Sequence, residues 1–188
     1  LKLAKVINSN NKWIGGDTVV VQLGDQIDRC RGHGPSCQKP ETTVNDENSD
    51  VRILEFFTKL HNQASKKRGA VYSLLGNHEL MNVNGDLRYV SYKGLVDFDE
   101  DGVLKNGYEK RKIAFEKGGK YAKFLGCSRK GVLIIGSNLF VHGGIVPKLA
   151  NEYKGKKGVE DINKIISRFL WNKLADKDNF SSITGTLD

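Results

Sequence analysis

Three polar motifs in this sequence contain residue types that bind metal ions or transfer protons, and each follows a short apolar run. They are GDQIDR at residues 24–29, GNHE at residues 76–79 and HGG at residues 142–144. The carboxylate of Asp25, the amide oxygen of Asn77 and the imidazole of His142 form a set of hard oxygen and nitrogen ligands, which suits Mn, Fe or Zn better than ions that prefer thiolates. In this order, the motifs predict a metal site.

The elements that must position these motifs are short buried strands. Four apolar runs are too short for helices, and we expect them to form one sheet. They cover residues 18–23, 70–75, 132–135 and 139–141. An apolar stripe over residues 51–64 predicts a helix between the first two strands, with Asp50 as its N-terminal cap. Strand, helix and strand in this order favour parallel pairing, and ligands bind where the carboxyl ends of parallel strands meet. The sequence therefore predicts an α/β fold with its site at one edge of the sheet.

Other segments have patterns of their own. Apolar residues recur at helical spacing over residues 162–174 and predict an amphipathic helix, and residues 1–7 resemble the end of another helix. The polar stretch 30–49 is typical of a long loop, which in a compact domain is often functional. Residues 97–102 begin like a calcium loop, but Tyr108 stands where that loop needs a bidentate glutamate, so we expect a solvated acidic turn.

The motifs also carry a resemblance to a known family. GDQIDR, GNHE and the later HGG resemble the signature blocks of the calcineurin-like metallophosphoesterases, in the pattern of the phosphoprotein phosphatase branch. The stretch LLGNHELMNVNGDLRYVS at residues 74–91 is similar to a block of the Shewanella-like phosphatases. The resemblance implies a β-sandwich flanked by helices. It also implies a metal-dependent phosphatase that hydrolyses phosphomonoesters, on serine/threonine or tyrosine side chains of phosphoproteins, by direct attack of a metal-bridging hydroxide.

The metal ligands are implied by position in the same motifs. Asp25 would bridge two divalent ions, with Mn expected and Fe or Zn as alternatives. Asn77 and His142 would bind the second ion. Two such ions can generate hydroxide near neutral pH and stabilise both the attacking and the leaving oxygen.

Proton transfer and phosphate binding are assigned by the same resemblance. His78 would protonate the leaving oxygen, and Asp28 would orient His78 and stabilise its charge. Arg29 would hold the phosphate with its forked guanidinium, beside Asn77. Arg88 is a second phosphate-binding candidate.

The sequence departs from the family pattern at both ends. Nothing in residues 1–23 matches the family's first GDxHG block, and no histidine follows His142 to supply the family's last metal ligand. We therefore expect residues 1–188 to be a single partial domain that is incomplete at both ends and inactive on its own.

The composition keeps other functions open. The 30 Lys and Arg against 22 Asp and Glu give a formal net charge of +8, which favours phosphate-bearing partners. A dinucleoside-polyphosphate hydrolase of the same superfamily fits this charge, and so does a non-catalytic module that binds phosphate groups or nucleic acid. We favour the enzyme over nucleic-acid binding because His78, Asp28 and Arg29 form an acid, its orienting partner and a phosphate fork, which binding alone does not require.

The cysteines and the hydropathy pattern predict an intracellular, cytoplasmic protein. Cys30, Cys37 and Cys127 are too few for a disulfide framework, and no apolar run approaches the about 20 residues of a membrane span. Cys30, His33 and Cys37 lack a fourth zinc ligand. A cysteine pair or a redox-sensitive disulfide is therefore expected in this loop.

Overall fold

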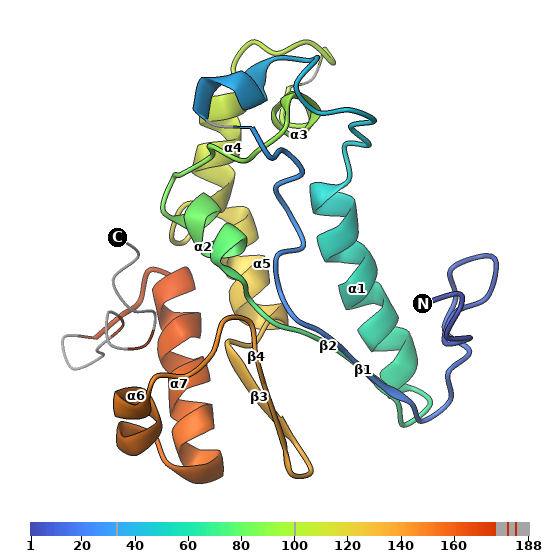
Figure 1. The fold of residues 1–188 in the computed structure, drawn as a ribbon, viewed down its shortest axis with the longest axis vertical. Coiled ribbons are helices and arrows are strands. Elements are labelled where there is room, and N and C mark those ends of the chain that lie inside the picture. The colour runs from blue at the N-terminus through green and yellow to red at the C-terminus, as the bar shows by residue number, and fades with distance from the viewer. Residues whose placement is uncertain (33, 100, 176–179, 181–182, 184–188) are drawn as a thin grey trace.

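The computed structural model describes residues 1–32, 34–99, 101–175, 180 and 183, and it combines short strands with helices (Figure 1). The strands are β1 (Val19–Gln22), β2 (Ala70–Ser73), β3 (Val132–Ile135) and β4 (Asn138–Val141). The helices are α1 (Asp50–Ser65), α2 (Asn77–Val83), α3 (Tyr92–Val96), α4 (Gly107–Phe115), α5 (Lys120–Ser128), α6 (Pro147–Glu152) and α7 (Gly155–Leu170), with a 3₁₀ helix, η1 (Gly34–Gln38). This mixture confirms the predicted α/β class. Within the described ranges, no helix is both long enough and apolar enough to cross a membrane.

The strands form two pairs rather than the one sheet that the sequence predicted. β1 and β2 run parallel, with Val19 opposite Ala70, which confirms the predicted parallel pairing, whereas β3 and β4 form an antiparallel hairpin. Between the described strands, the two pairs are joined by a bridge from Leu74 to Lys130, where Leu75 N donates to Lys130 O at 2.8 Å. The prediction of a single sheet was wrong because β3 forms its ladder of hydrogen bonds with β4.

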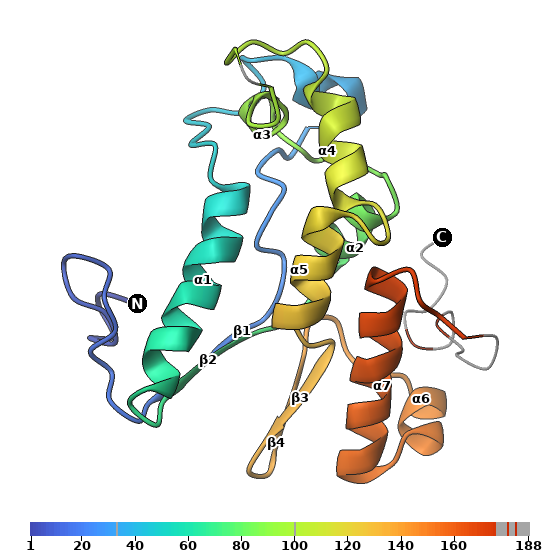
Figure 2. The same cartoon turned by 180° about the vertical axis from the view of Figure 1, so that it is seen from behind.

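Helix α1 covers one face of the β1–β2 pair (Figure 2). Leu54, Leu60 and Ala64 are fully buried, at the spacing of one helix face. The helix begins at Asp50, and Ser49 takes the N-cap position. The predicted cap role of Asp50 was wrong because its carboxylate turns inward and pairs with a buried arginine of α4.

Helices α5 and α7 pack together around a hydrophobic core. The predicted stripe on α7 is buried, and it consists of Ile162, Ile165, Ile166, Phe169 and Leu170. The helix ends at Leu170, because Asn172 takes a left-handed φ of 55° and the chain turns away. Leu174, predicted on the same stripe, lies beyond the helix and is 39% exposed.

The predicted helix end at residues 1–7 was wrong. Lys5 has a left-handed φ of 52°, and Ile7 pairs with Trp13 in an antiparallel bridge. Val6, Ile7 and Trp13 are buried in a cluster with residues of α1 and β2. Only part of the apolar pattern is therefore buried, since Ile7 packs in this cluster and Leu3 is fully exposed.

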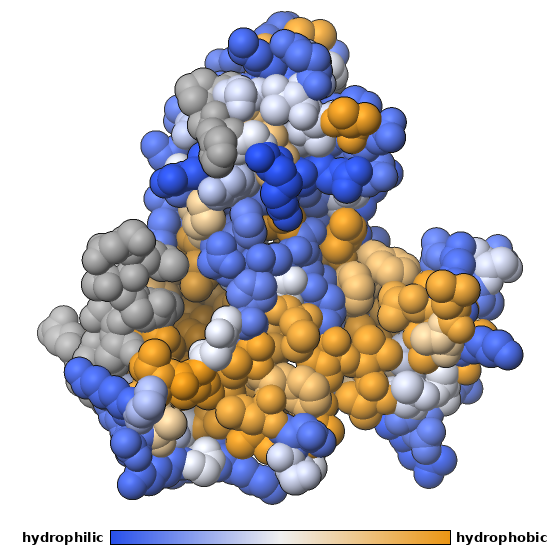
Figure 3. All heavy atoms as spheres, in the orientation of Figure 1, coloured by the Kyte–Doolittle hydropathy of each residue, from blue (hydrophilic) through white to orange (hydrophobic). Residues whose placement is uncertain are grey.

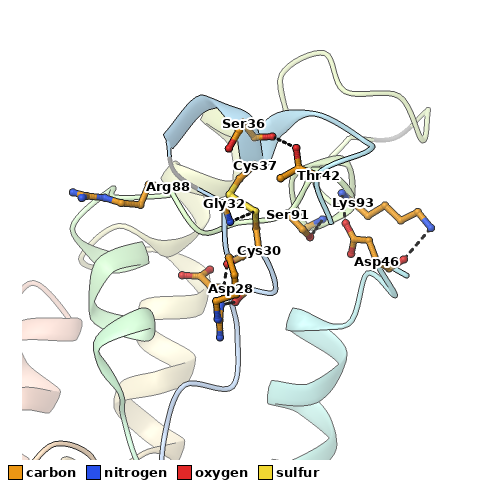
Figure 4. Close-up of a disulfide and its surroundings, with 12 residues drawn as sticks. Asp28, Cys30, Gly32, Ser36, Cys37, Thr42, Asp46, Arg88, Ser91 and Lys93 are labelled. Carbon is orange, nitrogen blue, oxygen red and sulfur yellow. Dashed lines mark hydrogen bonds between the residues drawn. A yellow bond between two sulfur atoms is a disulfide. The ribbon is translucent and has the colours of Figure 1, made fainter. Parts of the chain in front are cut away.

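The loop that follows the first motif contains η1 and a disulfide. Cys30 and Cys37 are bonded, with their Cα atoms 5.8 Å apart (Figure 4). This pairing confirms the predicted cysteine pair over a zinc site, and His33 lies outside the described residues. Cys127 is free and exposed.

The acidic segment at residues 97–102 leads into α4. Oδ2 of Asp99 accepts hydrogen bonds from the backbone N–H groups of Lys105 at 2.9 Å and Gly107 at 2.6 Å. Asp101 pairs with the ammonium of Lys105 at 2.5 Å. These contacts tie both carboxylates to the segment that leads into α4.

The strands leave an apolar face uncovered. Val19, Leu23 and Leu139 are each about half exposed, and apolar side chains gather over the strands in Figure 3. Polar side chains dominate the part of the molecule around α3 and α4 in the same view. The carboxyl ends of β1 and β2 point toward this polar part (Figure 1).

Candidate functional site

The first two motifs touch because β1 and β2 are parallel and end side by side. Gly24 has a φ of 97°, and a Cβ there would come within 2.7 Å of the backbone nitrogen of Gly76. A Cβ on Gly76 would overlap Oδ1 of Asp25. Both positions therefore need glycine, so that the two loops can meet through their backbones.

Glu79 joins the two loops from the inside. Its Oε2 accepts hydrogen bonds from the backbone N–H groups of Gly76 at 2.6 Å and Asp25 at 3.0 Å, and its Oε1 accepts one from Gln26 at 2.6 Å. Burial raises the pKa of the Glu79 carboxyl, and these three backbone donors oppose the shift. Sequence reasoning gave Glu79 no role, although a glutamate three residues after the glycine that precedes a helix is a known signal of such bonding.

The three predicted metal ligands converge. Nε2 of His142 lies 3.2 Å from Oδ2 of Asp25 and 3.1 Å from Oδ1 of Asn77. Nδ1 of His142 lies 2.6 Å from the carbonyl oxygen of Leu23. A carbonyl oxygen only accepts, so Nδ1 donates to it and Nε2 faces the two side-chain oxygens.

This donor set fits a divalent cation. Oδ2 of Asp25, Oδ1 of Asn77 and Nε2 of His142 lie side by side, and a cation among them would be bound by all three. A histidine that donates one ring N–H to a backbone carbonyl while the other nitrogen faces a metal is the usual arrangement in metal sites. Only two of the three donors in this set are His or Asp, because the third is Asn77. Groups of three or more His, Cys, Asp or Glu side chains that could hold a metal ion do not occur in the part of the chain that the structure describes.

His78 and Asp28 form a hydrogen-bonded dyad beside these donors. Nδ1 of His78 lies 2.9 Å from Oδ2 of Asp28, whose side chain is fully buried. The hydrogen bond to Asp28 raises the pKa of His78, against the opposing effect of burial. The backbone N–H of His78 also donates to Oδ1 of Asp25 at 3.1 Å. The dyad is thus tied directly to one of the predicted metal ligands.

Sequence reasoning missed two side chains that surround Asp28. Nδ2 of Asn82 lies 2.9 and 3.0 Å from the two carboxylate oxygens, and Nη2 of Arg111 lies 3.4 Å from Oδ1. Asn82 stands four residues after His78 on α2, so helical spacing could have revealed it. Arg111 lies 83 residues from Asp28 in the sequence.

The predicted phosphate-binding arginines lie apart from the dyad's hydrogen bonds. Arg29 is exposed, and its Nη2 lies 3.8 Å from Oε1 of Glu47. Arg88 is exposed, pairs with Asp86 at 2.8 Å and extends away from the loop of residues 28–46 (Figure 4). Arg31 instead donates from Nη1 to the backbone oxygen of Asp28 at 2.6 Å, and its charge opposes protonation of the dyad histidine.

The chain is similar to phosphoesterases over most of its length. The calcineurin-like phosphoesterase family matches residues 2–181. Uncharacterized protein R398 of Acanthamoeba polyphaga mimivirus is 43% identical over 132 residues, which cover 66% of this chain and 52% of that protein. Shewanella-like protein phosphatase 2 of Arabidopsis thaliana is 29% identical over 204 residues, which cover 90% of this chain and 46% of that protein.

A solved structure shares the fold. The structure of a cold-active protein tyrosine phosphatase superposes with a TM-score of 0.61 and 26% identity, covering 95% of this chain and 44% of that chain. This chain therefore spans about half the length of the relatives that it matches.

Proposed function

This chain belongs to the calcineurin-like phosphoesterase family, and from that premise we propose that it acts as a metal-dependent phosphatase on phosphomonoesters of proteins. Calcineurin-like phosphoesterases use divalent metal ions. The activity proposed is that of the full-length protein, because the chain spans about half the length of its relatives.

One observation carries the proposal: the residues that could bind a cation directly contact the His78–Asp28 dyad that could donate a proton. Asp25 faces His142 with Oδ2 and accepts the backbone N–H of His78 with Oδ1. Metal ions and a general acid must act on the same phosphate ester, one near the attacking oxygen and the other near the leaving oxygen. The contact through Asp25 supports this requirement, because it keeps the two kinds of group close together.

Each side chain has a defined task in this proposal. Asp25, Asn77 and His142 would hold the metal, with Mn as the expected ion and Fe or Zn as alternatives. When bound, divalent ions make a water molecule acidic near neutral pH and neutralise charge on the phosphate oxygens. His78 carries a proton on each nitrogen in its charged form. Because Asp28 accepts from Nδ1, Nε2 is the nitrogen that gives its proton to the leaving oxygen.

The substrate class is supported by the relatives and by charge. Shewanella-like protein phosphatase 2 and a cold-active protein tyrosine phosphatase are named as protein phosphatases, and the net charge of +8 suits phosphorylated partners. We infer phosphoserine/threonine or phosphotyrosine as the substrate side chain. Arg29 and Asn77 remain the predicted phosphate contacts, whereas Arg88 is a weaker candidate because it pairs with Asp86 and extends away (Figure 4). Arg31 joins them because of its place beside the dyad.

The test is phosphate release from phosphotyrosine and phosphoserine peptides by the full-length protein, with MnCl₂ and with EDTA. We expect release that requires the metal and falls about 10²- to 10⁴-fold in His78→Asn, because general acid catalysis contributes on that scale. His61→Asn is the matched control. His61 lies on α1, where its Nδ1 is 3.0 Å from the backbone oxygen of Val71, and its replacement should leave the rate unchanged.

The outcomes separate the alternatives. Equal rates in His78→Asn and the wild type would refute the proposed acid. Hydrolysis of diadenosine tetraphosphate without hydrolysis of peptides would identify a dinucleoside-polyphosphate hydrolase. Salt-sensitive nucleic-acid binding without any hydrolysis would identify a binding module. A separate assay of residues 1–188 alone tests the prediction that they are inactive. Turnover by this piece that is lost in His78→Asn would contradict that prediction.

A further inference from the structure

We propose that Arg111 is a positioning residue, which holds the carboxylate of Asp28 in the orientation that serves His78. The inference rests on the proposed function, since it concerns the proton that His78 would deliver. Arg111 lies on α4 and is fully buried. It would act through Asp28. Its buried positive charge must be compensated by partners in the interior.

The guanidinium of Arg111 connects four parts of the chain. Nε donates to Oδ1 of Asn82 at 2.9 Å, and Nη1 donates to the backbone oxygen of Gly94 at 2.9 Å. Nη2 donates to Oδ2 of Asp50 at 2.9 Å and to Oδ1 of Asp28 at 3.4 Å. A guanidinium has donors in a fixed planar fork, so these contacts together fix its orientation.

The contact with Asn82 sets a second restraint on Asp28. Because Nε of Arg111 can only donate, the atom of Asn82 that faces it must be the amide oxygen. The NH₂ group of Asn82 therefore faces Asp28, at 2.9 Å from Oδ1 and 3.0 Å from Oδ2. Arg111 thus orients Asp28 directly and through Asn82. Oδ2 of Asp28 is left aligned with Nδ1 of His78 at 2.9 Å.

Charge gives the same result. Asp28 and Asp50 are both buried, and the backbone N–H of Asp28 donates to Oδ2 of Asp50 at 3.3 Å. Arg111 lies between the two carboxylates and opposes the effect of burial, which raises the pKa of Asp50. Without Arg111, two neighbouring buried carboxylates would lose their shared cation, which is strongly unfavourable. Asp28 would then lose the cation that helps to hold its carboxylate toward His78.

The guanidinium also lies close to two aromatic rings. Its carbon lies 5.6 Å from the ring centre of Phe98 and 5.0 Å from that of Phe115. Such cation–aromatic contacts add stabilisation to a desolvated guanidinium. Together with the hydrogen bonds, these contacts restrict the guanidinium to the position in which it contacts Asp28.

Arg129 provides a matched control, because it is a second buried arginine without a contact to the dyad. It is 4% exposed, against 0% for Arg111. It donates to Oε1 of Gln26 at 2.7 Å, Oγ1 of Thr58 at 2.8 Å and the backbone oxygen of Leu54 at 2.8 Å. Replacing Arg129 therefore also removes a buried guanidinium but leaves the partners of Asp28 in place.

The kinetic test compares two substrates of different leaving group with the full-length Mn²⁺-loaded protein. Phenyl phosphate needs a proton on its leaving oxygen, whereas 4-nitrophenyl phosphate releases a stable anion. We expect Arg111→Gln to lower kcat for phenyl phosphate by about 10- to 100-fold, the usual scale for losing an orienting partner, and to lower kcat for 4-nitrophenyl phosphate far less. Arg129→Gln should affect both substrates equally. Equal losses on both substrates in Arg111→Gln would overturn the proposal.

A second measurement does not depend on hydrolysis. In metal-free protein labelled with ¹⁵N-histidine, the Nδ1–H proton of His78 should resonate far downfield because of its bond to Asp28. This resonance should be lost or shifted in Arg111→Gln and kept in Arg129→Gln, and an unchanged resonance in Arg111→Gln would overturn the inference. If the wild type hydrolyses neither substrate, the proposed function fails and the resonance alone decides the role of Arg111. Arg111→Lys, which keeps the charge but cannot make all four contacts, carries the same tests if Arg111→Gln does not fold, with the same expected direction.

Discussion

Replacing Asp28 with asparagine perturbs the dyad with almost no change in side-chain shape. Asn82 Nδ2 lies 2.9 Å and Arg111 Nη2 lies 3.4 Å from Oδ1, and both groups can only donate. The new amide therefore turns its oxygen toward Asn82 and Arg111 and its NH₂ toward Nδ1 of His78. Two donors then face each other where the wild type has an N–H and a carboxylate 2.9 Å apart. The imidazolium form of His78 is disfavoured as a result.

The size of the effect follows from the bond that is lost. A hydrogen bond to a charged group contributes about 1.5–3 kcal/mol, which corresponds to a loss of about 10- to 150-fold in rate if the full amount is felt at the transition state. The assay is kcat of the full-length Mn²⁺-loaded protein for phenyl phosphate at one pH. The loss for 4-nitrophenyl phosphate should be smaller, since its leaving group departs without a proton. If Asp28→Asn hydrolysed phenyl phosphate with the same kcat as the wild type, the role of the dyad would be refuted.

The same substitution has a pH signature in the metal-free protein. Asp28 raises the pKa of His78 above its ordinary value of 6.5, so the folded state holds this proton more tightly than the unfolded state does. The pair then stabilises the fold fully below about pH 6.5, and the stabilisation is lost as the pH rises through the raised pKa. In EDTA, the difference in unfolding free energy between the wild type and Asp28→Asn should shrink as the pH rises through this range. Urea denaturation measures it, and a difference that grows with pH would contradict the assigned direction.

Two further substitutions probe how the motifs are held. Glu79→Gln replaces one carboxylate oxygen with an NH₂ group, so at least one of the backbone donors of Asp25, Gln26 and Gly76 loses its acceptor. We expect a loss of about 1–3 kcal/mol in unfolding free energy, measured by urea denaturation, and an unchanged midpoint would contradict the tie between the loops. His142→Ala removes Nε2 from the donor set. It should weaken Mn²⁺ binding by a larger factor than the loss of a residue that only supports a metal ligand, which costs about 10- to 100-fold. Isothermal titration measures that affinity, and equal binding by His142→Ala and a His61→Ala control would argue against the site.

The convergence of the candidate metal donors could be predicted from sequence because it depends on local signals. Asp25 and Asn77 each follow a short apolar run, and the helix between those runs implies parallel strands that end together. His142 follows the strand β4 in the same way, and it reaches the other two in the structure. The pattern of α7 was equally local, and its buried stripe appears as predicted up to Leu170.

The errors arose where the same local pattern fits more than one tertiary arrangement. The spacing of residues 1–7 fits a helix, but the left-handed Lys5 and the bridge from Ile7 to Trp13 fold the segment onto α1 instead. Four apolar runs fit one sheet, yet the partner of β3 is its own hairpin neighbour. Burial of Ile7 and Trp13 in a cluster with α1 and β2 decided the first case, and the tight hairpin between β3 and β4 decided the second.

Contacts between distant buried residues can leave a trace in sequence, which Arg111 shows and Asp50 does not. Asp50 at a helix start fits the common preference for an acidic residue near the positive end of the helix dipole, so nothing local indicated an inward carboxylate. Arg111 stands midway between Gly107 and Phe115, four residues from each, and all three are buried on α4. A charged residue on the buried face of a helix must bring a partner of opposite charge into the interior, since an unpaired buried charge is too costly. The dyad acid Asp28 needs such a cation, and the buried arginine needs such a carboxylate. An arginine at an apolar position of a helix is therefore a sequence signal of a buried carboxylate elsewhere in the chain, and for Arg111 that signal leads to Asp28 and Asp50.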